Sequence, residues 1–167
     1  MKHKKLKNGG FIFLEILIAV ALISIVFILM VGIGFQSLNI SASLEKSSKA
    51  DSFLKEEMEA VRSFRDGTTW ATNGLGSALT GTANPYHLVL DTATNPPKWV
   101  LATGAETINI FTRKVVFDKV SRNPSSQNIE SAYNSANDDP KTSKATATVS
   151  WEDKSLELIA YFTNWKE

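Results

Sequence analysis

The 167-residue chain contains no cysteine and only two histidines. Disulfide bonds, cysteine nucleophiles and Cys/His zinc sites are therefore excluded. Beyond the first ten residues the only histidine is His87, which we expect on a strand with one side exposed. No Gly-x-Ser-x-Gly turn, the nucleophile motif of α/β-hydrolases, is present. We expect a protein that is not an enzyme and that uses no cofactor.

Positive charge is also scarce outside the N-terminus. Lys2, Lys4, Lys5 and Lys7 lie within the first ten residues, which contain no acidic side chain. Without this segment, 14 of the 18 basic residues remain against 17 acidic ones, so the net charge changes from +1 to −3. Nucleic-acid-binding surfaces need a basic patch or stripe, so we expect no nucleic-acid partner.

An apolar run from Phe11 to Phe35 contains one charged residue, Glu15. As a helix, this run of roughly 25 residues would be about 37 Å long, enough to span a bilayer. The preceding lysines predict a cytoplasmic N-terminus, with the rest of the chain outside. A carboxylate at the centre of a membrane helix costs about 2.5–3.5 kcal/mol on insertion scales, so Glu15 requires a functional partner.

The segment Lys4-Lys5-Leu6-Lys7-Asn8-Gly9-Gly10-Phe11, together with Glu15, resembles the class III signal of type IV prepilins and type II secretion pseudopilins. The resemblance implies that prepilin peptidase cuts after Gly10 and N-methylates Phe11. It implies a single-pass protein of the inner membrane, surrounded by lipid until an assembly platform adds it to a surface or periplasmic filament. The partners would then be other pilin or pseudopilin subunits.

In this family the residue that matches Glu15 is thought to meet the N-terminal amine of a neighbouring subunit. Opposite charges 4 Å apart attract by about 4 kcal/mol at an effective dielectric of 20, which is comparable with the cost of burying the carboxylate. Many pilins carry a disulfide-bounded C-terminal loop, which this chain cannot form. The departure favours a minor pilin or pseudopilin over a typical major subunit.

The resemblance also implies an α+β, pilin-like fold, in which one long N-terminal helix packs against a small antiparallel sheet. We expect a leader at residues 1–10, a transmembrane or filament-core helix at 11–35, an amphipathic continuation at 36–66 and a β-rich domain at 67–167. Gly32 and Gly34 either weaken the helix, as a proline does in many pilins, or allow close packing through small residues.

Residues 49–66 have helical periodicity, with charged residues off the apolar stripe. One helix from about Phe11 to Arg65 is predicted, ended by Asp66-Gly67 with the glycine in the left-handed position. The alternative is two helices broken near Ser37–Ser43. The stripe consists of Ala50, Phe53, Leu54, Met58, Val61 and Phe64.

In the C-terminal part, the sequence pattern predicts a surface connection at residues 67–84, followed by three to five antiparallel strands. A hairpin is expected around residues 152–155, and an exposed loop at residues 121–144. The expected strands are Tyr86–Leu90, Lys98–Leu101, Thr107–Val120, Ala145–Trp151 and Leu156–Phe162. The residues expected to face the core are Ile108, Ile110, Val149, Trp151, Leu158 and Ala160.

The domain contains two groups of residues that could bind a ligand. Asp138 and Asp139 are candidates for a calcium site, but adjacent acids usually mark a solvated turn, and we expect no metal. The four tryptophans are expected to fill the core rather than to stack on a ligand. They are Trp70, Trp99, Trp151 and Trp165.

Two other functions remain open. The helix could serve only as a tether for an extracytoplasmic binding module, or the chain could belong to a competence pseudopilus that contacts DNA. The sequence does not distinguish a pilus from a secretion or a competence system.

Overall fold

The computed structural model describes residues 9–166. Its first element is the helix α1, Gly9–Gly67, which runs without a break. No proline precedes Pro85, so nothing in this stretch interrupts the backbone hydrogen bonds. The single long helix is confirmed, and the break near Ser37–Ser43 is absent. The position expected for Gly67 is wrong, because this glycine is the last helical residue and its φ is not left-handed.

The chain divides into two units, residues 1–46 and residues 47–167. In the first unit, the described part consists of α1 alone, and all residues from 11 to 42 are exposed. The second unit contains the rest of α1, two short helices and all the strands, and it has its own hydrophobic core.

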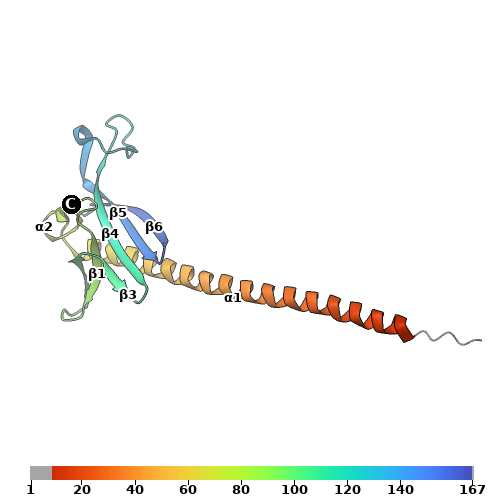
Figure 1. The fold of residues 1–167 in the computed structure, drawn as a ribbon. Coiled ribbons are helices and arrows are strands. Elements are labelled where there is room, and N and C mark those ends of the chain that lie inside the picture. The colour runs from red at the N-terminus through yellow and green to blue at the C-terminus, as the bar shows by residue number, and fades with distance from the viewer. Residues whose placement is uncertain (1–8, 167) are drawn as a thin grey trace, which may run out of the picture. The chain divides into compact units, whose positions relative to one another are not determined.

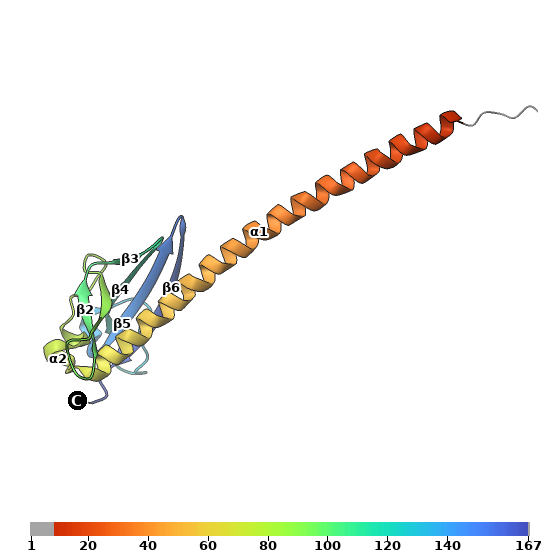
Figure 2. The same cartoon turned by 90° about the horizontal axis from the view of Figure 1, so that it is seen from below.

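In the second unit, the helical stripe predicted from the sequence packs against one face of a sheet (Figures 1 and 2). All members of the stripe are buried except Phe53, which is partly buried and packs edge-to-face on Phe111 with the ring centroids 5.5 Å apart. The α+β class with a long helix on a small antiparallel sheet is therefore as expected. Buried residues from both layers form the core: Ala50, Leu54, Met58, Val61 and Phe64 from the helix, and Leu88, Val115, Phe117, Ala145, Val149 and Phe162 from the sheet.

The sheet has six antiparallel strands in the order β2-β1-β4-β5-β6, with β3 also paired to β4. The expected number of strands, three to five, is one too low. The strands are β1 Tyr86–Asp91, β2 Lys98–Thr103, β3 Glu106–Ile108, β4 Phe111–Ser121, β5 Asp138–Trp151 and β6 Lys154–Thr163.

The additional strand arises because the run 107–120 is not one strand. A turn at Asn109 and Ile110 divides it into β3 and β4, and Asn109 adopts a positive φ of 56°. Asparagine tolerates this conformation better than most residues. Ile110 lies at the turn and is 50% exposed, so its predicted core position is wrong.

The other predicted core residues have different outcomes. Val149 and Trp151 are buried, Ala160 packs against the core, and Ile108 is partly buried. Leu158 is 36% exposed, so its core position is wrong. It lies on β6, which ends the sheet and has a neighbouring strand on one side only.

The loop is shorter than expected, because β5 begins at Asp138 and the irregular part is confined to residues 122–137, which include the short helix η2, Ser135–Asn137. The hairpin is confirmed: β5 and β6 are joined by a two-residue turn, Glu152-Asp153, and pair along their lengths.

The connection between α1 and β1 is more than a surface loop. It forms α2, Trp70–Asn73, and η1, Leu75–Ser77, and it buries Trp70 and Leu75 in the core. The Trp70 indole N–H donates to the Pro140 carbonyl at 2.9 Å, which ties the connection to β5.

Candidate functional site

The exposed apolar segment, residues 11–44, is the first candidate site. Phe11 is 82% exposed, and the most apolar 18-residue window of the helix has a mean hydropathy of 3.2 and no buried residue. By length and composition, α1 is a candidate membrane span. Inside this stretch the Ser24 hydroxyl donates to the Val20 carbonyl at 2.7 Å, so it needs no partner from outside the helix.

Glu15 lies on α1 four residues after Phe11, so the two residues share one face of the helix. Within residues 9–166, its carboxylate has neither an ion pair nor a side-chain hydrogen bond. No other charged residue occurs between Phe11 and Glu45. A partner for Glu15 must therefore come from outside this part of the chain.

The predicted cleavage bond, Gly10–Phe11, lies in the first turn of α1. Residues 1–8 of the predicted leader are outside the described residues. The helix continues through Gly32 and Gly34, and a Cβ added at either would meet no atom within 4 Å beyond the helix's own backbone. Both interpretations of this pair, a weak point or a place for close packing with another helix, remain predictions.

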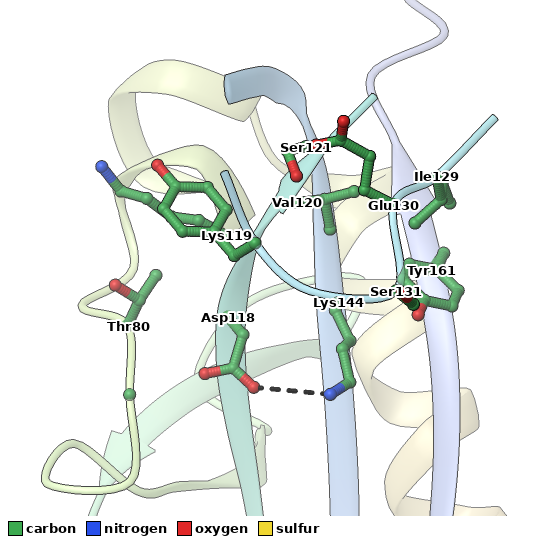
Figure 3. Close-up of a pocket in the computed structure, with 12 residues that line it drawn as sticks. Thr80, Asp118, Lys119, Val120, Ser121, Ile129, Glu130, Ser131, Lys144 and Tyr161 are labelled. Atoms are coloured by element: carbon green, nitrogen blue, oxygen red, sulfur yellow. Dashed lines mark ion pairs between the residues drawn. The ribbon is translucent and has the colours of Figure 1, made fainter. Parts of the chain in front are cut away.

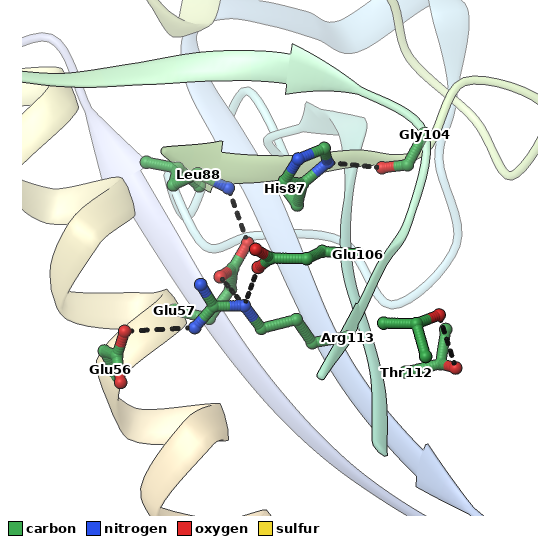
Figure 4. Close-up of polar contacts among 9 residues, drawn as sticks. Glu56, Glu57, His87, Leu88, Gly104, Glu106, Thr112 and Arg113 are labelled. Atoms are coloured by element: carbon green, nitrogen blue, oxygen red, sulfur yellow. Dashed lines mark hydrogen bonds and ion pairs between the residues drawn. The ribbon is translucent and has the colours of Figure 1, made fainter. Parts of the chain in front are cut away.

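The second candidate is a group of four charged side chains, Glu56, Glu57, Glu106 and Arg113, which we call the Arg113 cluster (Figure 4). The Arg113 Nε lies 2.6 Å from Glu106 Oε2 and 3.3 Å from Glu57 Oε2, and its Nη1 lies 3.1 Å from Glu56 Oε1. Arg113 and Glu57 are buried, whereas Glu56 is half-exposed.

The cluster occupies the place where two strands part. β1 pairs with β4 only at Tyr86 and Val115, because β3 takes the next positions along the same edge of β4. The Leu88 N–H consequently lacks a β4 partner and donates instead to Glu57 Oε1 at 3.0 Å. Glu57 of α1 thus replaces the hydrogen bond that a strand would have supplied.

The electrostatics follow from this burial. Burial raises the pKa of the Glu57 carboxyl, and the opposing effects of Arg113 and of the Leu88 N–H offset only part of the rise. Burial also lowers the pKa of Arg113, but its hydrogen bond to Glu106 and its pairing with Glu57 and Glu56 outweigh this and raise it. Arg113 therefore stays cationic, and the cluster links α1 to β1, β3 and β4.

Sequence reasoning missed this cluster, although a signal was present. Glu57 lies three residues after Leu54 and four before Val61, so it falls within the apolar stripe rather than beside it. Arg113 likewise alternates with Phe111 and Val115, which face the core. A carboxylate in a helical stripe and a cation on the inner face of a strand predict a buried ion pair.

The candidate calcium ligands are engaged by protein donors. Asp139 Oδ2 lies 2.6 Å from Arg122 Nε and accepts from the Thr142 hydroxyl at 2.6 Å. Burial raises the pKa of Asp139, but hydrogen bonds from Thr142, Arg122 and the Lys141 N–H hold it below its ordinary value. Asp138 accepts from the Tyr133 hydroxyl at 3.0 Å. Among the described residues, no group of three His, Asp or Glu side chains is arranged to hold a metal ion.

The remaining candidates are the aromatic residues and His87. Trp70 and Trp151 are buried and Trp99 is partly buried, as expected, but Trp165 is 65% exposed, so its predicted core position is wrong. His87 lies on β1 and is half-buried, with Nδ1 3.2 Å from the Gly104 carbonyl oxygen.

No family model, no curated protein and no solved structure matches this chain.

Proposed function

We propose that this protein is a structural subunit of a type IV pilus-like or type II secretion filament, processed after Gly10 and assembled through α1. The observation that carries the proposal is the exposed apolar segment, in which the only charge lies one helical turn after Phe11. The leader that precedes it resembles the prepilin signal, and the α+β fold is of the expected type.

The exposed apolar segment needs other molecules to cover it. Monomeric proteins rarely expose contiguous apolar patches larger than a few hundred Å², so residues 11–44 require lipid or other chains around them. Lipid suits the apolar side chains but not the Glu15 carboxylate. A filament core made of several copies would supply both the apolar cover and, from the Phe11 amine of a neighbour, a cation for Glu15.

Intact mass measurement of the membrane-extracted protein, made in cells that contain prepilin peptidase, tests the proposal. We expect the loss of residues 1–10 and the addition of one methyl group at Phe11. An uncut chain in the membrane would favour the alternative, in which the helix only tethers a binding module.

A pair of glycine variants makes the mass measurement specific to the cleavage site. Gly10→Val should abolish processing, because a branched side chain beside the cut bond blocks access of the peptidase to the backbone. Gly9→Val, the same change one residue earlier, is the matched control and should still be processed. Equal processing of both variants would rule out a cut after Gly10.

A further inference from the structure

A cleft of about 410 Å³ lies at one end of the sheet (Figure 3). Its floor is the sheet face turned away from α1, and Ile129, Glu130 and Ser131 of the loop cross over it. The Gly81 N–H donates to the Phe117 carbonyl at 2.8 Å, which fixes the wall on the opposite side to the edge of β4. The volume lies within the range of about 300–1,000 Å³ usual for small-molecule sites.

The floor is a row of three side chains on adjacent strands. Asp118 of β4 is opposite Lys144 of β5, which is opposite Tyr161 of β6. Their sequence neighbours Phe117, Ala145 and Phe162 are buried in the core, so these three side chains share the other face. The Cβ atoms of opposed residues lie about 5 Å apart, so a carboxylate, an ammonium and a phenol come from neighbouring positions in one row.

Within residues 9–166, the three side chains of this row form no hydrogen bond. The Lys144 Nζ lies 3.9 Å from Asp118 Oδ2, too far for a hydrogen bond, and the two side chains are 33% and 40% exposed. A hydroxyl group bound beside both would accept from Nζ and donate to Oδ2, which is a pair of bonds that water or an alcohol can make.

The composition of the lining restricts the ligand. The lining contains two acidic residues, Asp118 and Glu130, and two basic residues, Lys119 and Lys144, so its formal charges balance. This balance disfavours a polyanion, and the two cations disfavour a metal ion. Tyr161 is 48% exposed, and a tyrosine ring offers a flat apolar surface with a polar tip. A ligand with many hydroxyls, no charge and one apolar face satisfies all of these groups.

We infer that the cleft binds a neutral saccharide, with a ring packed on Tyr161 and hydroxyls bonded to Asp118 and Lys144. This inference does not depend on the proposed filament function, since the cleft lies within the second unit of the chain.

Saturation-transfer NMR on the full chain tests this inference. A zwitterionic detergent without a sugar headgroup must be used, since a maltoside would compete for the cleft. The probes are maltotriose, lactose and N,N′-diacetylchitobiose, with sialyllactose and glucuronic acid as acidic comparisons. We expect transfer to at least one neutral probe and none to the acidic sugars. Absence of transfer to all three neutral probes, or transfer to the acidic ones alone, overturns the inference.

Variants then locate the binding. Asp118→Asn and Tyr161→Ser should each weaken affinity for the bound probe more than tenfold, while Ile159→Ser, an exposed residue of the same strand outside the cleft lining, should leave it unchanged. Circular dichroism establishes folding, and Lys144→Met replaces any variant that does not fold. Affinity unchanged in the cleft variants, or lowered equally by Ile159→Ser, overturns the assignment.

Discussion

At the scale of single residues, Glu57 is the least exposed charged side chain described, at 1%. An isolated buried carboxylate would be strongly unfavourable, but here it accepts the Leu88 N–H and lies beside the Arg113 guanidinium. Its Oε2 accepts no hydrogen bond from the described residues. The Arg113 cluster joins the helix to the sheet. Its contribution to the free energy of folding therefore depends on whether Glu57 is protonated.

We predict that the stability difference between the wild type and Glu57→Gln depends on pH. The pKa of Glu57 is raised above its ordinary value of 4.5, so the folded state holds this proton more tightly than the unfolded state. The stabilisation from Glu57 is then fully present below pH 4.5 and is lost as the pH rises through the raised value. Denaturant unfolding of the full chain in detergent, followed by tryptophan fluorescence at several pH values, measures this.

Glu56→Gln provides the control for this series. Glu56 pairs with the same arginine from a half-exposed position, so its replacement should change stability by no more than about 1 kcal/mol at any pH. A difference between wild type and Glu57→Gln that stays constant from acidic to neutral pH would contradict the argument from burial.

We predict that Arg113→Met destabilises the second unit by about 3–5 kcal/mol, because it leaves a buried carboxylate without a cation. The double variant Arg113→Met/Glu57→Gln should recover part of this loss, since it removes both charges together. The free energy of unfolding is measured by denaturant titration near neutral pH. If the two single losses simply add in the double variant, Glu57 and Arg113 are not coupled.

At the scale of elements, helix α1 was the most predictable part of the chain. Its periodicity from Ala50 to Phe64 coincides with the buried face, because three- and four-residue spacing leaves little ambiguity over a long segment. The same periodicity does not identify Glu57 as buried. A single carboxylate within an apolar stripe is expected to be exposed, because its partner Arg113 is distant in sequence.

The strand boundaries were less predictable. The turn at Asn109 interrupts a run whose composition suits one continuous strand, and an Asn-Ile pair lacks the glycine that usually marks a two-residue hairpin turn. The start of β5 at Asp138 was also missed, because its first residues are polar and resemble the preceding loop. The first residue of β5, Asp138, pairs with Ser121 after a bulge in β4. This pairing joins residues distant in sequence, so no local sequence pattern predicts it.

In the connection between α1 and β1, we predict that Gly76→Ala destabilises the second unit. A Cβ on Gly76 would lie 2.5 Å from Trp70 Cδ1, and Trp70 is held by the core and by its bond to Pro140. Overpacking of this kind costs about 1–3 kcal/mol. The melting temperature, followed by near-ultraviolet circular dichroism, should fall, and the Trp70 signal should change.

Gly67→Ala is the matched control. A Cβ at Gly67 would meet no atom within 4 Å, and the residue is the last of the helix, so alanine should change the stability by less than about 1 kcal/mol. Equal effects of the two substitutions would show that the contact with Trp70 is not what excludes a side chain from position 76.

At the scale of the whole molecule, the two units differ in how they are solvated. The second unit buries its apolar residues in its own core, whereas the described part of the first unit buries none between residues 11 and 42. The first unit therefore needs an environment that the chain itself does not supply. Lipid or the apolar helices of other copies can cover every side chain of the stretch favourably except the Glu15 carboxylate.

The last prediction follows from this exception. Under the proposed function, Glu15→Ala should leave membrane insertion intact but lower incorporation into filaments by more than about tenfold, because an attraction of about 4 kcal/mol to a neighbour's terminal amine is lost. Glu45→Ala, which removes the next acidic residue of α1, is the control and should assemble normally. Membrane fractionation measures insertion, and immunoblotting of sheared filaments measures assembly. If Glu15→Ala forms filaments in normal yield, the apolar segment assembles without this ion pair, and the carboxylate must serve another purpose.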